Sequence, residues 1–119
     1  ARAAAAKRLR AAVAANPFLV AGTKRADTVI MEALGERAFT KVGAEGVFCA
    51  ALPEQGLGIA IKCDDGAGRA AEVVLATLLL RLLDPGEAAR NVLAPLANPV
   101  LRNWNGIEVG TLRPAAALA

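Results

Sequence analysis

Apolar residues dominate the middle of the chain, with large and small side chains at alternate positions, and this pattern predicts three strands between residues 38 and 63. The first covers about 38–42. The next two, 46–52 and 57–63, form a hairpin around Pro53-Glu54-Gln55-Gly56, in which Leu52 faces Leu57 and Cys49 faces Ala60. One face then carries the larger side chains, namely Phe48, Ala50, Leu52, Leu57, Ile59 and Ile61. The other face carries small ones that would let a helix approach closely, namely Cys49, Ala51, Gly58 and Ala60.

Two helices are expected before this sheet. An alanine-rich helix over 1–15 ends at Asn16-Pro17, because the residue before a proline is disfavoured in the helical region. With no capping residue ahead of it, this helix looks like the continuation of one that starts upstream. A short helix over 27–34 is capped by Asp27 or Thr28 and ends at Gly35, with Ile30, Met31 and Leu34 facing inward.

The longest helix is expected over 67–83, after a turn at Asp64-Asp65-Gly66. It is apolar nearly all round, and its polar stripe consists of Arg69, Glu72, Thr77 and Arg81. Asp84-Pro85-Gly86-Glu87 then resembles a capping box that opens a further helix ending near Pro95. A last strand is expected over 107–112, after Trp104-Asn105-Gly106, where the tryptophan would be a packed anchor at a turn.

These elements predict an α+β fold in a single domain of residues 1–119, with an antiparallel sheet of three or more strands packed between helices. At 119 residues the chain suffices for one core and not for two. No disulfide is expected between the two cysteines, because Cys63 lies three rungs from Cys49 and on the opposite face. Free thiols suit a reducing cytoplasm.

Charge and hydropathy exclude two classes of partner. The net charge is +3, the cations are mostly scattered, and only 3% of the residues are aromatic, so nucleic acid is not an expected partner. The longest apolar segment, 73–83, is interrupted by Thr77 and Arg81 and is too short to span a bilayer, so no membrane association is expected.

A possible catalytic group is Lys41, which ends a strand-like run directly before Gly43 and Gly46. A lysine acts as a general base when burial or a nearby cation lowers its pKa, and Val42 with its small neighbours would supply that burial. On spacing alone, a solvated surface lysine is the commoner explanation of such a pattern. The chain contains no serine, histidine or tyrosine, so a nucleophile for Lys41 must lie outside it.

Several segments together resemble the C-terminal third of the L-asparaginase II family. They are Val20 to Ala33, Lys41-Val42-Gly43-Ala44-Glu45-Gly46-Val47, Gly58 to Gly66 with Arg69-Ala70, and Asn103 to Gly110 with Arg113-Pro114. The likeness extends over about residues 8–114 in the same order and with similar spacing. It implies a fold related to serine β-lactamases and glutaminases, in which a lysine-bearing strand is followed by an antiparallel hairpin and a helix.

The resemblance also implies hydrolysis of L-asparagine to L-aspartate and ammonia by serine and lysine pairs. The lysine of the second pair falls at Lys41, the one catalytic position that carries over. The other catalytic residues and the metal ligands would belong to an N-terminal part outside this chain, so no cofactor or metal is expected within it. The partners implied are L-asparagine or a similar small amide, the remainder of the polypeptide, and a second copy in a homodimer.

The same likeness marks candidate substrate-binding positions at Gly43, Ala44, Glu45, Arg25, Asp27 and Thr28. Glu45 would contact the substrate's ammonium group or pair with a neighbouring cation. A helix cap plus an ion pair explains Arg25, Asp27 and Thr28 nearly as well. Asp64-Asp65-Gly66 lacks the further acidic ligands of a calcium loop and is interpreted as a turn with a helix cap.

Two alternatives remain open from sequence. The chain is an interaction or dimerisation module, using the 67–83 helix or an exposed sheet edge as its surface. Otherwise it belongs to an amidohydrolase for another amide such as glutamine, because nothing in these residues distinguishes the two substrates.

Overall fold

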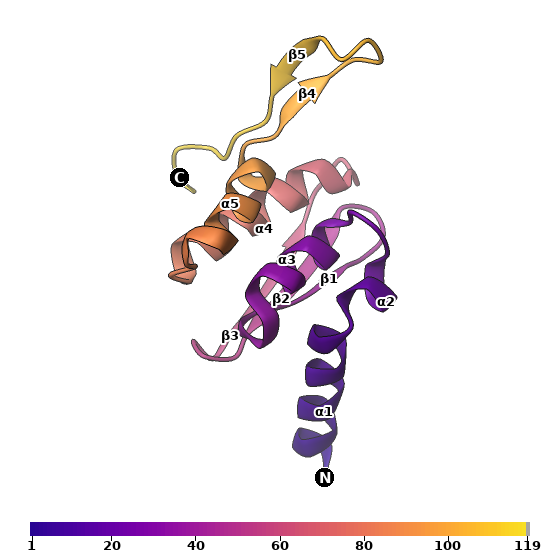
Figure 1. Cartoon of the computed structure of the whole chain (residues 1–119), viewed down its shortest axis with the longest axis vertical. Coiled ribbons are helices and arrows are strands. Elements are labelled where there is room, and N and C mark those ends of the chain that lie inside the picture. The colour runs from indigo at the N-terminus through magenta and orange to yellow at the C-terminus, as the bar shows by residue number, and fades with distance from the viewer. Residues whose placement is uncertain (119) are drawn as a thin grey trace.

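The computed structural model describes residues 1–118 and consists of helices, a three-stranded sheet and a separate two-stranded hairpin (Figure 1). Five α-helices lie in this part of the chain: α1 (Arg2–Ala15), α2 (Pro17–Ala21), α3 (Ala26–Leu34), α4 (Gly68–Leu82) and α5 (Glu87–Ala97). A short 3-10 helix, η1 (Gly35–Arg37), leads from α3 into the sheet. The α+β fold expected from the sequence is confirmed.

The main sheet is antiparallel, with the strand order β1 (Phe39–Val42), β2 (Val47–Leu52) and β3 (Leu57–Lys62). Its register matches the prediction, because Cys49 pairs with Ala60 and Leu52 with Leu57. Phe48 and Leu52 are fully buried on the inward face. The alternation of large and small residues was therefore sufficient to fix both the pairing and the faces.

Helices α3 and α4 cover the inward face of the sheet, and α5 packs behind them against both (Figure 1). The core lies between these layers and includes Ile30 and Leu34 of α3, and Leu75 and Leu79 of α4. Thr77 belongs to this buried side, where its hydroxyl donates to the Val73 carbonyl at 2.8 Å. This member of the predicted polar stripe is therefore buried, and the helix satisfies its hydroxyl internally.

The outward face of the sheet is covered only in part. Helix α1 reaches it beside Phe39 and Ala51, whereas Gly58 and Ala60 of β3 are exposed. From this contact α1 runs away from the body, and its N-terminus lies at one end of the molecule (Figure 1). Helix α1 thus packs against one corner of this face, and the small residues of β3 stay exposed.

Two sequence predictions about helix starts were wrong. Helix α3 begins after Arg25 with no side-chain cap, because Asp27 and Thr28 use their side chains elsewhere. The capping box at Asp84 does not form: α5 starts after Gly86, and the Asp84 carboxylate lies 3.7 Å from Arg90 instead. Helix α5 ends at Ala97, close to the end predicted near Pro95. The turn before α4 is present, with Asp65 accepting from the Ala67 N–H at 2.9 Å, but Ala67 itself is the cap residue.

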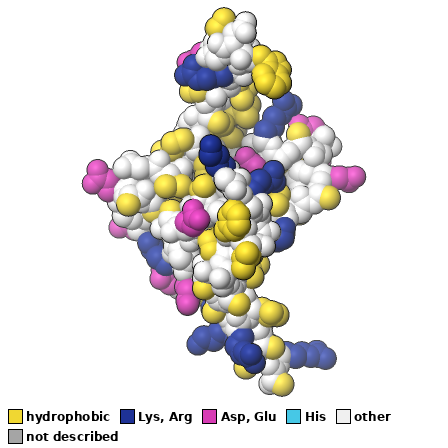
Figure 2. Space-filling view, turned by 45° about the vertical axis from the view of Figure 1, so that its right-hand side comes forward, with side chains coloured by type: hydrophobic (Ala, Val, Ile, Leu, Met, Phe, Trp, Pro, Cys, Tyr) yellow, Lys and Arg dark blue, Asp and Glu magenta, His cyan; other side chains and the backbone are white. Residues whose placement is uncertain are grey.

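The C-terminal hairpin pairs β4 (Val100–Arg102), which the sequence did not predict, with β5 (Glu108–Thr111). It projects from the body at the end opposite α1 (Figure 1). Trp104, expected to be a packed anchor, is fully exposed at the turn, and Ile107 and Val109 are also exposed. Figure 2 shows apolar side chains on this projecting hairpin and basic ones along the N-terminal helix.

Candidate active site

Lys41 lies on β1, an edge strand, and its side chain points to the outward face of the sheet. It sits directly opposite Cys49 of β2, whose own partner on β3 is Ala60, so its neighbours across the sheet on that face are small. The Lys41 Nζ donates a 2.6 Å hydrogen bond to the carbonyl of Val42. The side chain is exposed, so the burial expected around Lys41 is not provided by residues 1–118.

The loop after Lys41 is held in one conformation by its neighbours. The Gly43 N–H donates to the Val47 carbonyl at 2.8 Å, and the Cys63 N–H donates to the Gly46 carbonyl at 2.9 Å. Glu45 and Gly46 both have positive φ, at 57° and 69°, and the Lys62 ammonium donates to the Glu45 carbonyl. Two consecutive left-handed residues turn the chain sharply, and they leave Gly43, Ala44 and Glu45 exposed beside Lys41.

The structure joins Asp27 to this loop. Asp27 is 1% exposed in the first turn of α3, and its Oδ1 accepts a 2.8 Å hydrogen bond from the backbone N–H of Val42. The candidate set Asp27, Lys41 and residues 43–45 therefore converges at the end of β1. Sequence reasoning identified Asp27 but assigned its carboxylate to a helix cap, since nothing local indicates a strand as its partner.

Arg25 and Thr28 contribute differently. The Thr28 hydroxyl donates to the Gly22 carbonyl at 2.6 Å and so fixes the turn between α2 and α3. Arg25 is exposed directly before α3. Its charge acts on Glu72 of α4, a residue that sequence reasoning had placed only in a polar stripe.

Glu72 is half-buried, and burial raises the pKa of its carboxyl group. The positive charge of Arg25 lowers that pKa in part, and the negative charge of Asp27 raises it. Glu72, Arg25 and Asp27 therefore form one electrostatic cluster behind the end of β1. The signal in the sequence that could have marked Glu72 is its place as an acid in a helix that is apolar nearly all round.

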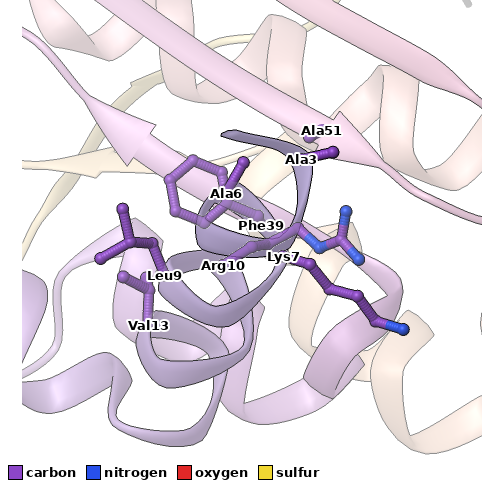
Figure 3. Close-up of a pocket in the computed structure, with 8 residues that line it drawn as sticks. All are labelled: Ala3, Ala6, Lys7, Leu9, Arg10, Val13, Phe39 and Ala51. Atoms are coloured by element: carbon purple, nitrogen blue, oxygen red, sulfur yellow. The ribbon is translucent and has the colours of Figure 1, made fainter. Parts of the chain in front are cut away.

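An apolar groove of about 670 Å³ lies on the same face of the sheet as Lys41 (Figure 3). It forms where α1 meets Phe39 and Ala51, and Phe39 precedes Lys41 by two positions on β1. Its wall on the helix side consists of Ala3, Ala6, Lys7, Leu9, Arg10 and Val13. The sequence did not predict this groove, because it depends on the angle at which α1 leaves the sheet.

The two cysteines, Cys49 and Cys63, are free and half-buried. Among residues 1–118, no three cysteine, histidine or carboxylate side chains lie close enough together to bind one metal ion. The resemblance implies a metal site outside this chain, and no step of the mechanism proposed for this chain depends on one. No helix in the described range has both the length and the apolar character that crossing a bilayer requires.

The range matched in the family comparison includes the segments that form this site. The family model for L-asparaginase II matches residues 1–114, a range that contains α1, the whole sheet and the Lys41 loop. No curated protein matches the chain. The match extends over nearly the full sequence and includes every candidate residue described above, and the chain therefore belongs to the L-asparaginase II family.

Proposed function

We propose that this chain contributes Lys41 and the loop 43–46 to the active site of an enzyme that hydrolyses L-asparagine to L-aspartate and ammonia. An asparaginase-like function in general follows from the family. The observation that carries the finer proposal is the position of Lys41: its amine is exposed at a strand edge, next to a loop with a fixed backbone. A second protein surface can reach it there.

The nucleophile in this proposal is a serine from another part of the polypeptide, because the 119 residues contain none. This makes the chain the C-terminal part of a longer enzyme, with a fold related to serine β-lactamases. The upstream part would cover the outward face of the sheet and thereby bury Lys41. Any metal site of the enzyme would also lie in that part.

The proposed reaction has two halves. The neutral amine of Lys41 accepts the proton of the serine hydroxyl while the serine oxygen attacks the side-chain amide carbon of asparagine. The resulting ammonium returns this proton to the amide nitrogen as the C–N bond breaks, and ammonia leaves. Water then attacks the acyl-serine ester and gives a proton to Lys41, which passes it to the serine oxygen as the ester bond breaks, so that aspartate leaves and the serine and the neutral amine are regenerated.

Substrate binding would use the exposed loop beside Lys41. The Glu45 carboxylate is free to meet the α-ammonium group of an amino acid, because the contact with Lys62 uses only its backbone carbonyl. Gly43 and Ala44 let the substrate approach the backbone closely. Thr28 and Asp27 support the wall of the pocket, since the structure gives both side chains backbone partners.

The experiment is an ammonia-release assay on the complete protein with L-asparagine and L-glutamine as separate substrates. We expect turnover of asparagine, and loss of that turnover in Lys41→Ala. A preference for glutamine would keep the mechanism and change the substrate. Release of ammonia from neither amide would refute the proposal.

A second candidate function, assembly through an exposed surface, is favoured by the C-terminal hairpin. Trp104, Ile107 and Val109 are all exposed there, and a group of exposed apolar side chains usually marks a surface that contacts another protein. The helix α4 does not provide the surface considered from sequence, because it is buried against the sheet and α5.

We propose that the complete enzyme is a homodimer in the cytoplasm, where its free cysteines stay reduced. Sedimentation of the complete protein tests the dimer.

A further inference from the structure

The backbone N–H of Val42 points away from the sheet. The next residue, Gly43, donates its N–H to Val47 of β2, so the N–H of Val42 faces the open side of β1, where no strand pairs with it. An unpaired N–H at a sheet edge is usually left to water. In this chain the Asp27 Oδ1 accepts it at 2.8 Å.

The Asp27 carboxylate is buried, and its hydrogen bond to the Val42 N–H stabilises it there. At 1% exposure its carboxylate has almost no contact with water, and a buried carboxylate is costly unless it is hydrogen-bonded. Its place in the first turn of α3 favours negative charge through the helix dipole, yet its side chain does not cap that helix. Its partner lies 15 positions further along the chain, on another element.

The same residue, Val42, is also bound on its carbonyl side. The Lys41 Nζ donates to the Val42 carbonyl at 2.6 Å, so Asp27 and Lys41 hold the two polar groups of one backbone residue. A shift of Val42 would therefore move the base of the Lys41 side chain and the start of the loop at Gly43.

We propose that Asp27 is a positioning residue, which fixes the end of β1 through the Val42 N–H and thereby sets the location of the Lys41 amine. This inference rests on the proposed function, because it assigns the bond a role in that reaction. Asp27 acts through the backbone of Val42 and does not itself touch substrate. What the role requires is an acceptor oxygen at this point, so an asparagine can replace the aspartate.

The surrounding charges are consistent with this assignment. On α4, Glu72 is close enough for the Asp27 charge to raise its pKa, after the larger effect of its own burial. Arg25, directly before α3, acts on the same carboxyl group with the opposite sign. Asp27→Asn removes one negative charge from this cluster while it keeps the acceptor.

The test compares Asp27→Ala, Asp27→Asn and the control Glu32→Ala in the complete protein. Glu32 is an exposed acid on the same helix. The readouts are kcat and KM for asparagine, and hydrogen–deuterium exchange in a peptide that contains Val42. We expect Asp27→Ala to lower kcat about tenfold or more with a smaller change in KM, and to accelerate exchange at Val42. Asp27→Asn is expected to stay within about threefold of the wild type in both readouts, as is Glu32→Ala.

Two results would overturn the assignment. One is an Asp27→Asn variant that folds and is impaired as severely as Asp27→Ala, since the charge would then matter and not the acceptor. The other is wild-type kcat in Asp27→Ala despite faster exchange at Val42. If Asp27→Ala does not fold, Asp27→Asn decides alone: retained kcat and protection support the role, and a tenfold loss refutes it. Lys41→Ala is assayed in parallel, because full activity in that variant would refute the proposed function itself.

Discussion

The backbone of Gly46 lies against Cys63: the Cys63 N–H donates to the Gly46 carbonyl at 2.9 Å, and a Cβ at Gly46 would lie 3.0 Å from the Cβ of Cys63. The same Cβ would lie 3.0 Å from the carbonyl carbon of Gly66. With its φ of 69°, this position requires glycine for two independent reasons. The turn before α4 thus contacts the far end of the loop that follows Lys41 and holds it in place.

Gly46→Ala is expected to lower the free energy of unfolding by about 1–3 kcal/mol, because it adds both backbone strain and a steric clash. Gly58→Ala is the matched control. Gly58 lies on β3 with no atom within 4 Å of an added Cβ, so alanine there is expected to be neutral or slightly stabilising. Urea unfolding of both variants makes the comparison. Equal stability of the two would show that the loop backbone relaxes freely.

The hydroxyl of Thr40 is a second point at which stability can be tested. Thr40 is fully buried beside Lys41, and within residues 1–118 its Oγ1 has no hydrogen-bond partner. Thr40→Val keeps the shape and removes an unsatisfied group, so we expect a gain of about 1 kcal/mol in the free energy of unfolding.

Thr77→Val is the counterpart, because the Thr77 hydroxyl does have a partner in the Val73 carbonyl. We expect that variant to be less stable than the wild type by about 0.5–1 kcal/mol. Thermal unfolding of both proteins is the measurement. A loss of stability in Thr40→Val as large as that in Thr77→Val would mean that Thr40 has acquired a partner in the complete protein.

The raised pKa of Glu72 predicts how stability changes with pH. Burial, reinforced by Asp27 and opposed by Arg25, makes the folded state bind a proton more tightly than the unfolded state, where the pKa is near its usual 4.5. The Glu72 contribution to stability therefore falls as pH rises from 4.5 through the raised pKa. Glu72→Gln is expected to be more stable than the wild type at pH 7, with the difference shrinking as the pH approaches about 4.

Urea midpoints measured at several pH values test this sign. Glu32→Gln serves as a control, because Glu32 is an exposed acid on α3. If Glu72→Gln is less stable than the wild type at pH 7, the attraction to Arg25 outweighs the cost of burial and the pKa of Glu72 is lowered instead of raised.

Trp104 provides a direct spectroscopic test, since it is the sole tryptophan in the sequence. As the residue is fully exposed at the tip of the β4–β5 turn, we expect red-shifted fluorescence that iodide quenches readily in the isolated chain. The turn itself does not depend on the indole, because the Asn103 side chain accepts from the N–H groups of Asn105 and Ile107. Trp104→Ala is therefore expected to change stability by less than about 0.5 kcal/mol. Blue-shifted, protected fluorescence would show that the indole is packed.

The sequence predicted the sheet well because each step of that prediction was local or periodic. Alternation assigned Phe48 and Leu52 to one face, and the turn at Pro53–Gly56 fixed the pairing of Cys49 with Ala60. The starts of α3 and α5 were predicted poorly for a physical reason. A carboxylate near a helix start can bind its own helix or a more distant donor, and Asp27 binds Val42 while Asp84 approaches Arg90.

In the candidate site, too, local features could be predicted from the sequence and contacts between distant elements could not. Lys41 was singled out by the family resemblance, since its glycine-flanked motif alone favours a surface lysine, and its catalytic role stays a prediction. The exposure of Lys41, the partner of Asp27 and the environment of Glu72 depend on how α3 and α4 meet β1, and no local pattern encodes that. Trp104 shows the same limit, since an aromatic residue at a turn looks alike in sequence whether it is packed or exposed.

The most direct test of a catalytic role for Lys41 is the kcat for asparagine of Lys41→Ala in the complete protein, measured beside Arg2→Ala. Arg2 is an exposed cation at the start of α1, so its replacement removes the same charge in a position that favours alanine. We predict that Lys41→Ala folds normally and loses at least about a hundredfold in kcat, while Arg2→Ala stays near the wild type. Near-normal asparagine hydrolysis by Lys41→Ala would contradict that role.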